Sequence, residues 1–210
     1  MGDIGAVILA AGGSARLGQP KQLLILGDGE TLVHSAVRSA LEAGCAKVCV
    51  VTGAAHDQVA AAVSDLHPTI AHNRYWSRGI GSSIRHGVSR LSDVSAIVLL
   101  TSDQPALDAE IVRTLLSRHA QHESAIVASH YANTLGTPAL FPRSYFPALR
   151  FLPDKCGAKF LIEANRGRVE VVLFAEGAFD VDWPSDLQTW RKRWSRSLRT
   201  HTSETAGPAH

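Results

Sequence analysis

A run of small and cationic residues follows the first apolar segment of the chain. Residues 5–10, GAVILA, lead into AGGSARLGQPKQ, where Gly12 and Gly13 are followed by Arg16 and Lys21. Backbone N–H groups in a glycine-rich turn approach an anion without obstruction by a Cβ atom. Arginine can bind phosphate oxygens through two parallel hydrogen bonds, and lysine supplies a compact point charge. This stretch therefore predicts a phosphate-binding loop.

The loop has neither of the two most common phosphate-binding spacings. A dinucleotide fingerprint needs GxGxxG in the first strand–helix turn, and a P-loop needs GxxxxGK followed by Ser or Thr. Gly13 and Gly18 have the P-loop spacing, but Lys21 comes two positions late and no hydroxyl residue follows it. The spacing argues against an NAD-linked oxidoreductase and leaves a tight turn with solvated charges as the structural alternative.

A carboxylate occupies a second position suited to chemistry. Asp103 follows the apolar run 96–101, and Pro105 stops helix formation just behind it. Mg²⁺ prefers one or two carboxylates together with phosphate oxygens, so Asp103 is a candidate metal ligand. A helix cap or an Asx turn is the structural alternative. No Ser-His-Asp or Cys-His pattern indicates a covalent nucleophile, which suits a reaction whose substrate brings its own.

Strand-like and helix-like segments alternate along the chain. Apolar, β-branched runs predict strands over 5–10, 47–53, 96–101, 125–129 and 169–174. Segments of helical period predict helices over 32–44, 57–66, 81–91, 109–121 and 185–194. This order predicts an α/β fold with a doubly wound, mostly parallel sheet. Ligands of such sheets bind beyond the carboxyl ends of the strands, where the glycine loop and Asp103 both lie.

Composition and charge limit the class of protein. The 210 residues are 45% hydrophobic and 19% charged, which suits one domain with one core. Residues 191–210 hold five basic residues against Glu204, which leaves a charge of −2 on residues 1–190. We therefore expect a single domain over 1–190 without nucleic-acid binding, followed by a basic, disordered tail over 191–210. No apolar run is long enough for a signal peptide or membrane span, so we expect a soluble, cytoplasmic protein.

The cysteines and histidines indicate no metal or disulfide framework. Cys45, Cys49 and Cys156 form no CxxC pair and are expected to be reduced. His119 and His122 lack a third ligand nearby, so we expect them on a solvated helix face rather than in a zinc site.

Five motifs in order resemble those of nucleotidyltransferases that transfer NMP from an NTP. They are LAAGGSARLGQPKQLL (9–24), GIGSSIRHGV (79–88), LLTSDQP (99–105), GTPALFP (136–142) and PDKCGAKFLI (153–162). The set is similar to the molybdenum cofactor cytidylyltransferase branch, which is related to the corresponding guanylyltransferases. The resemblance spans residues 4–190 and implies a Rossmann-like, GT-A-like nucleotidyltransferase fold.

The resemblance implies a role for each matching residue. The implied catalytic residues are Arg16, Lys21 and Asp103. The implied nucleotide contacts are Leu9, Ala10, Ala11, Gly12, Gly13, Arg16, Lys21, Asn73, Ser82 and Ser83. Mg²⁺ is implied at Asp103 and at Asp182 in FDVDWPSDL (179–187), with Asp180 as a rival ligand. The implied acceptor contacts are Gly136, Thr137, Pro138 and Lys155.

Three of these segments leave alternatives open. Ser82 and Ser83 could cap a helix whose free N–H groups face the nucleotide or the second substrate, and for Ser83 capping alone is an equally good explanation. Trp76 is expected to pack. Thr137 replaces the histidine usual in the resemblance, and Lys155 is as plausible in solvent as at an anionic acceptor.

The resemblance implies transfer of CMP from CTP to the terminal phosphate of molybdopterin or the molybdenum cofactor. Ala11 in LAAG, where guanylyltransferases have glycine, favours CTP over GTP. GTP and other phosphorylated acceptors, such as a sugar, polyol or small acid, remain alternatives. So does a non-catalytic nucleotide-binding factor that helps a molybdenum hydroxylase mature; such a hydroxylase or its chaperone is the expected protein partner.

Overall fold

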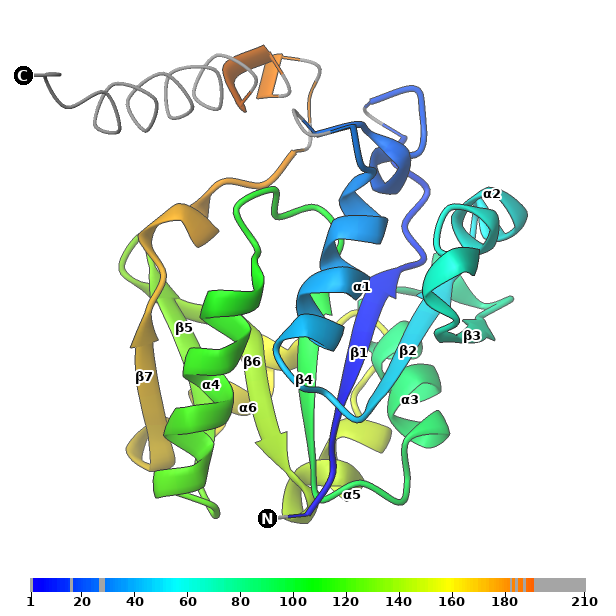
Figure 1. The fold of residues 1–210 in the computed structure, drawn as a ribbon. Helices are drawn as coiled ribbons and strands as arrows, with labels where there is room; N and C mark the ends of the chain where they lie inside the picture. Colours follow the sequence, from blue (N-terminus) through cyan, green and yellow to red (C-terminus); the bar gives the residue numbers. More distant parts are fainter. Residues whose placement is uncertain are drawn as a thin grey trace, which may run out of the picture.

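The computed structural model describes residues 2–15, 17–26, 29–181, 183, 185, 186 and 188–190. Within this part the chain forms a seven-stranded sheet in the order β3-β2-β1-β4-β6-β5-β7 (Figure 1). The strands are β1 (Ile4–Ala10), β2 (Lys47–Thr52), β3 (Thr69–His72), β4 (Ala96–Thr101), β5 (Ile126–Tyr131), β6 (Thr134–Pro142) and β7 (Val169–Leu173). β6 is antiparallel to β4 and β5, whereas the other neighbouring strands are parallel.

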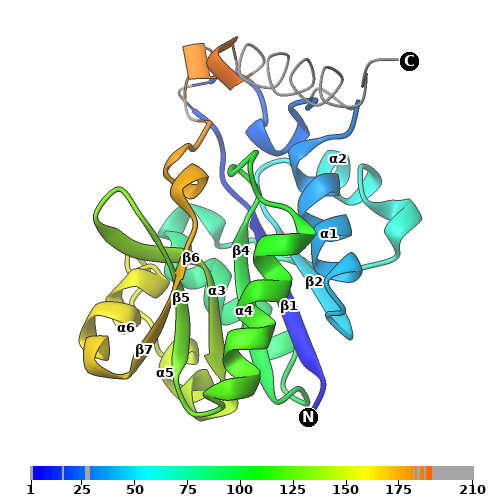
Figure 2. The ribbon, with the colours of Figure 1, turned by 60° about the vertical axis from the view of Figure 1, so that its left-hand side comes forward.

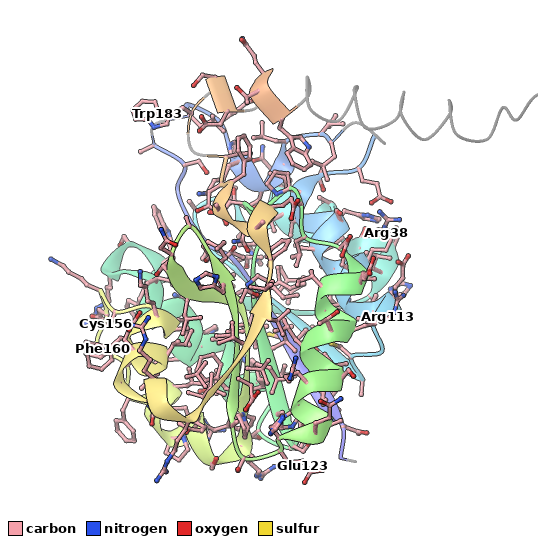
Figure 3. The ribbon with its side chains drawn as sticks, turned by 90° about the vertical axis from the view of Figure 1, so that its left-hand side faces the viewer. Arg38, Arg113, Glu123, Cys156, Phe160 and Trp183 are labelled. Carbon is pink, nitrogen blue, oxygen red and sulfur yellow. The ribbon has the colours of Figure 1, made fainter. Side chains whose placement is uncertain are left out.

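Helices cover both faces of the sheet (Figure 2). They are α1 (Leu32–Glu42), α2 (His56–Ala61), α3 (Ile80–Arg90), α4 (Ala109–Gln121), α5 (Phe146–Arg150) and α6 (Ala158–Ala164). Successive side chains of β1 point to opposite faces, so Ile8 packs in one core with α1 and α4, and Val7 packs in the other with α3, α5 and α6. In Figure 3 Arg38 and Arg113, on α1 and α4, lie on one side of the sheet, and Cys156 and Phe160 lie on the other.

The strand order reverses between β1 and β4. From β1 the chain builds β2 and β3 on one side and then returns to place β4 on the other side of β1. Loops that leave the carboxyl ends of β1 and β4 therefore diverge and open a crevice, which is the usual ligand site of such sheets.

A third apolar cluster anchors the segment that follows β1. It contains Leu17, Leu24, Leu26, Leu32, Val181 and Trp190, all buried. The backbone N–H of Val181 also donates to the carbonyl oxygen of Asp103, at 3.0 Å. These contacts hold the segment around residue 181 beside the loops that leave β1 and β4.

The α/β fold and the mostly parallel sheet are confirmed, and all five predicted strands form. Two strands were missed: β3, a short strand at the sheet edge, and β6 in the sheet interior. The helix predicted over 57–66 ends earlier, at Ala61, and a separate 3-10 turn covers Ser64–Leu66. The helix predicted over 185–194 lies partly, and the tail over 191–210 wholly, outside the described residues.

The environment of His119 differs from the prediction. Its side chain is 6% exposed rather than solvated, and this burial lowers the pKa of the imidazole. His122 lies beside Glu170 at the end of α4, with 3.6 Å between Nδ1 and Oε1. Cys45, Cys49 and Cys156 are free thiols, as predicted. In the described part of the chain no helix is long and apolar enough to cross a membrane.

Candidate active site

A cavity of about 320 Å³ opens at the carboxyl ends of β1 and β4, where the strand order reverses. Its walls come from the loop after β1, the start of α3 and the residues after β4. They are Leu9, Ala11, Gly12, Lys21, Gln22, Trp76, Ser77, Gly79, Ile80, Ser83, Thr101, Ser102 and Asp103. Six residues assigned from the sequence to catalysis or nucleotide binding thus meet in one hollow.

Lys21 and Asp103, separated by 82 positions in the sequence, form an ion pair in this cavity. Lys21 Nζ donates to Asp103 Oδ2 at 2.6 Å, and both side chains are about one-fifth exposed. The backbone N–H of Lys21 donates to Ser14 Oγ at 2.9 Å, which closes the loop on itself. The other carboxylate oxygen, Asp103 Oδ1, is buried and has no hydrogen-bond partner in the described part of the chain. The predicted juxtaposition of lysine and aspartate is therefore present.

The glycine loop lies against Trp76. A Cβ atom added to Gly13 would lie 2.8 Å from the indole ring, and one added to Gly53 would lie 2.4 Å from the carbonyl oxygen of Ala11. Ala11 O in turn accepts a hydrogen bond from the N–H of Ala54 at 3.2 Å. Glycine at these positions therefore lets the loops after β1 and β2 close around the indole. Trp76 packs as expected and also lines the cavity.

The serines at the start of α3 do not cap it. The N-cap residue is Gly79, and Ser82 and Ser83 lie within the first turn. Asn73 is 2% exposed, and its Nδ2 donates to Ser82 Oγ at 2.8 Å and to Ser83 Oγ at 3.1 Å. Its Oδ1 accepts from the N–H of Tyr75 at 3.0 Å. The predicted capping role was wrong. The Asn73 amide instead supports the start of α3, part of the cavity wall, through its hydrogen bonds to the two serines.

The segment 153–156 supports the same wall from the other side. Gly79 has a φ of +136°, and a Cβ atom there would lie 2.3 Å from the carbonyl oxygen of Asp154. The Asp154 carboxylate binds Arg85 and lies 3.2 Å from Arg78 Nε. The Arg85 guanidinium, helped by Arg78, holds the pKa of Asp154 below its ordinary value. Lys155 follows as an exposed residue at this edge of the cavity.

The predicted acceptor segment lies beside Asp103 and forms a bulge. Gly136 pairs with Ser129 and Ala139 with Ala128, so Thr137 and Pro138, joined by a cis peptide bond, are extra residues in β6. The Pro138 carbonyl oxygen accepts from Ser129 Oγ at 2.7 Å.

Gln104 and Tyr131 brace this bulge. Gln104 Nε2 donates to Thr137 O at 3.2 Å and to Gly177 O at 2.9 Å, and its Oε1 accepts from Thr101 Oγ1 at 3.3 Å. Burial raises the pKa of the Tyr131 hydroxyl, and the charges of Asp180 and Asp103 raise it further. Tyr131 therefore keeps its proton at neutral pH, and its hydroxyl lies so close to Gly136 that a Cβ atom there would collide with it.

Some predicted residues lie away from the cavity or outside the described part. Ala10 points into the core, while Ser82 and Asn73 lie behind the wall. Arg16 and Asp182 lie outside the described residues, and Asp180 is exposed. No cluster of three or more His, Cys, Asp or Glu side chains suited to a metal occurs among the residues described. Among the described residues that line the cavity, Asp103 alone carries a carboxylate, and its Oδ1 has no hydrogen-bond partner there.

Three polar residues of this region were not predicted from the sequence. Gln22 is buried in the cavity wall, and Gln104 and Tyr131 support the bulge. Gln22 and Gln104 each directly follow a predicted catalytic residue, which is a usable signal, but no periodic pattern distinguishes a buried glutamine from an exposed one. Tyr131 carries no sequence signal of its own, because its role depends on the bulge.

Curated relatives include both transferases and an oxidoreductase. Nicotine blue oxidoreductase of Paenarthrobacter nicotinovorans is 33% identical over 151 residues, covering 69% of this chain and 72% of that protein. Molybdenum cofactor cytidylyltransferase of Escherichia coli (strain K12) is 27% identical over 200 residues, covering 93% of this chain and 99% of that protein. This chain spans less than half the length of the bifunctional GlmU proteins that it also matches.

A solved structure with the same fold is Rv0371c from Mycobacterium tuberculosis H37Rv, with a TM-score of 0.79 and 28% identity over 90% of this chain and 97% of that one. A structure of Rv0371c in complex with manganese matches with a TM-score of 0.75 and 26% identity over 90% of this chain and 98% of that one. Residues 6–169 match the MobA-like NTP transferase domain. With this fold and loop, the chain belongs to the MobA-like NTP transferase family and is a nucleotidyltransferase.

Proposed function

We propose that this enzyme transfers CMP from CTP to the terminal phosphate of molybdopterin or the molybdenum cofactor and releases pyrophosphate. The observation that carries the proposal is the Lys21–Asp103 pair, in a cavity lined by the glycine loop where β1 and β4 diverge. The likeness to the E. coli cytidylyltransferase over nearly the whole of both chains supports the choice of acceptor. Ala11 in the cavity wall supports cytosine, because its methyl group narrows the space left for a base.

In this proposal the chain acts by positioning and charge. The triphosphate lies along the glycine loop, with Arg16 and Lys21 neutralising the pyrophosphate that leaves. The acceptor phosphate attacks the α-phosphorus in line, forming a new P–O bond as the bond to pyrophosphate breaks. Reactions of this type need oriented reactants and compensated charge rather than a covalent nucleophile.

The Lys21–Asp103 contact describes the starting state. In the ligand-free protein each side chain neutralises the other at 2.6 Å. A triphosphate in the cavity competes for Lys21, and release of Lys21 leaves the Asp103 carboxylate in need of another cation. Binding of the nucleotide and of a metal ion is thereby coupled through one pair of side chains.

We propose Asp103 and Asp182 as the ligands of Mg²⁺, with Asp180 as the rival second ligand. The unpaired, buried Oδ1 of Asp103 suits a hard cation that prefers oxygen ligands. Bound there, the ion would supply charge neutralisation to the reacting phosphates. The manganese complex of Rv0371c supports a divalent ion in this fold.

The acceptor would contact Gly136, Thr137 and Pro138 at the bulge in β6. Gln104, which follows Asp103 in the sequence, links this bulge to the cavity by its hydrogen bond to Thr137 O. Lys155 stands at the opposite edge, against Gly79, and would meet an anionic group there. Thr137 keeps other phosphorylated acceptors open, and GTP remains the alternative nucleotide. A maturation factor without turnover would bind the nucleotide but release no pyrophosphate.

A second candidate is oxidoreductase activity, favoured by the name of the relative from P. nicotinovorans. This chain lacks the GxGxxG spacing of a dinucleotide site, and its cavity carries a cation–carboxylate pair. Titration with NADH and NADPH, followed by nicotinamide fluorescence, tests this candidate directly.

Pyrophosphate release tests the main proposal. The enzyme is incubated with each of the four NTPs and with molybdopterin, a sugar phosphate or a polyol phosphate, with Mg²⁺ or with EDTA. We expect release with CTP and molybdopterin in Mg²⁺ and none in EDTA. Preference for GTP would overturn the cytidylyl assignment, and preference for another acceptor would overturn the molybdopterin assignment. Nucleotide binding without release under all conditions would indicate the maturation factor.

A further inference from the structure

Gln22 is a polar side chain built into the cavity wall. It lies in the 3-10 turn Lys21–Leu23, directly after the lysine that binds Asp103. Its side chain is 1% exposed and ranks among the largest fully buried side chains of the described chain. It lines the same cavity as Gly12, Ala11 and Asp103. Gln22 is therefore held in place by its surroundings and is not a solvated loop residue.

The two ends of the Gln22 amide have different surroundings. Nε2 donates to the carbonyl oxygen of Gly12 at 2.8 Å. This contact fixes the amide orientation, because a carbonyl oxygen only accepts. Oε1 is buried and has no hydrogen-bond partner in the described part of the chain.

A second buried glutamine provides a comparison within the same site. Gln104 is 5% exposed, and both of its amide ends are occupied, through Thr137, Gly177 and Thr101. Both the nitrogen and the oxygen of the Gln104 amide therefore form hydrogen bonds within the protein. In Gln22 only the nitrogen does so, and the oxygen is left without a partner in the described part of the chain. Buried polar atoms without partners are rare in folded proteins, and each one calls for an explanation; an oxygen in a cavity wall can be completed by a ligand, an ion or a water molecule.

The chemistry of a nucleotide limits what can complete this oxygen. The triphosphate carries acceptor oxygens and, at neutral pH, almost no donor, so it would repel an amide oxygen. The nucleoside half carries donors, namely the ribose hydroxyls and the amino or ring N–H groups of the base. We propose that Oε1 of Gln22 accepts a hydrogen bond from the nucleoside of the bound NTP, so that Gln22 positions the nucleoside while its nitrogen holds the glycine loop. This inference rests on the proposed binding of a nucleotide in the cavity.

Two other occupants are outcomes of the test. An amide oxygen also binds Mg²⁺ or a water molecule of its hydration shell. A buried water would complete the oxygen without any ligand. The nucleoside assignment differs from both because it predicts selectivity between nucleotides in the absence of metal.

The experiment measures binding of nucleoside monophosphates in EDTA by calorimetry. Wild-type enzyme, Gln22→Met and the surface control Gln58→Met are titrated with CMP, UMP, GMP, AMP, 2′-deoxy-CMP and 3′-deoxy-CMP. We expect wild type and Gln58→Met to bind CMP about tenfold more tightly than the analogue that lacks the relevant donor. Gln22→Met should bind CMP and that analogue equally. A deoxy analogue identifies a ribose hydroxyl as the donor, and UMP identifies the base amino group.

Chemical denaturation of the ligand-free variants completes the design. Methionine removes both the bond to Gly12 and the unpaired oxygen, so we expect Gln22→Met to keep the wild-type unfolding midpoint. A lowered midpoint with unchanged nucleotide ratios would show a structural, water-bound amide and overturn the inference. Ratios that change only when Mg²⁺ replaces EDTA would assign the oxygen to the metal and overturn it as well.

The design also separates this inference from the proposed function. A wild-type enzyme that binds none of the nucleotides would overturn both. Wild-type binding with ratios that Gln22→Met leaves unchanged would overturn the role of Gln22 alone.

Discussion

Two lysine–aspartate pairs lie at opposite ends of β4. Lys21 and Asp103 meet beyond its carboxyl end, where each side chain is about one-fifth exposed. Lys47 and Asp93 meet before its amino end, where they are 45% and 62% exposed. The residue types are the same, but the first pair lines a cavity next to a glycine loop and the second is surrounded by solvent.

The comparison shows that position in the sheet, and not residue type, makes a charged pair useful for chemistry. At the carboxyl ends, diverging loops create the cavity and partly shield its charges from solvent, so charges there interact more strongly with a ligand. At the amino ends an exposed ion pair is screened and contributes little to stability. Substitutions in the two pairs, and in the residues that support them, should therefore have very different consequences.

Asp103→Asn should separate the two ends most clearly. The amide keeps the volume of the carboxylate but loses the charge that a divalent ion needs, so we expect pyrophosphate release to fall by about 10³-fold or more. The unfolding midpoint should stay close to that of the wild type. Asp93→Asn is the matched control and should keep full activity. Normal turnover in Asp103→Asn would remove the proposed metal site.

Lys21→Met tests the cation of the same pair. Loss of the ammonium should slow turnover by about 10²–10³-fold, in the range found when one preorganised charge-stabilising donor is removed. CMP binding should change little, because CMP lacks the pyrophosphate that Lys21 is proposed to neutralise. Lys47→Met should leave both quantities unchanged. Equal effects of the two substitutions on turnover would show that position in the sheet does not distinguish the two lysines.

The parallel half of the molecule and the cavity beside it could be predicted from the sequence because their signals are local. The strands ending at Ala10, Thr52 and Thr101 are apolar runs bounded by polar turns. The glycine loop that carries Lys21 follows the first of these ends, and Asp103 follows the third. The switch in strand order then brings these residues together. Local pattern plus topology was sufficient to place Lys21 and Asp103 at one site, but their direct contact was not predicted.

The antiparallel half was harder to predict because its structure depends on distant partners. β6 contains Gly136, Pro138 and Pro142, residues that are unfavourable inside a sheet. The strand forms because Thr137 and Pro138 bulge out of the pairing with β5. Gln104 donates a hydrogen bond to the carbonyl oxygen of Thr137, and Ser129 donates one to that of Pro138. The sequence around β6 alone does not indicate that Ser129 and Gln104, on other elements, supply these hydrogen bonds.

Gln104→Met tests how far Asp103 depends on this bracing. Methionine keeps the size of the side chain but leaves the carbonyl oxygens of Thr137 and Gly177 without this donor. We expect the free energy of unfolding to fall by about 2 kcal/mol, the usual cost of buried polar groups that lose a partner. Turnover should fall by roughly tenfold through misplacement of the bulge.

Urea denaturation and a KM measurement for the acceptor check this prediction. Gln121→Met, at an exposed position at the end of α4, is the control. An unchanged unfolding midpoint would show that the bulge does not need Gln104.

Acidification should affect the exposed pair, with the smallest effect of the four. The hydrogen bond from Lys47 lowers the pKa of Asp93 below its ordinary value of 3.8. Between the folded-state pKa and the unfolded-state pKa of Asp93, the folded protein therefore binds fewer protons than the unfolded chain. The stabilisation by the pair is fully present above pH 3.8 and is lost as the pH falls through the lower, folded-state pKa.

The urea midpoints of the wild type and Asp93→Asn should differ slightly at pH 7 in low salt. They should converge once the pH falls below the lowered pKa of Asp93, and also in 0.5 M salt at pH 7, because salt screens exposed charges. A difference that persists under both conditions would mean that Asp93 acts through packing or shape, and the contrast with Asp103 would then rest on more than charge and exposure.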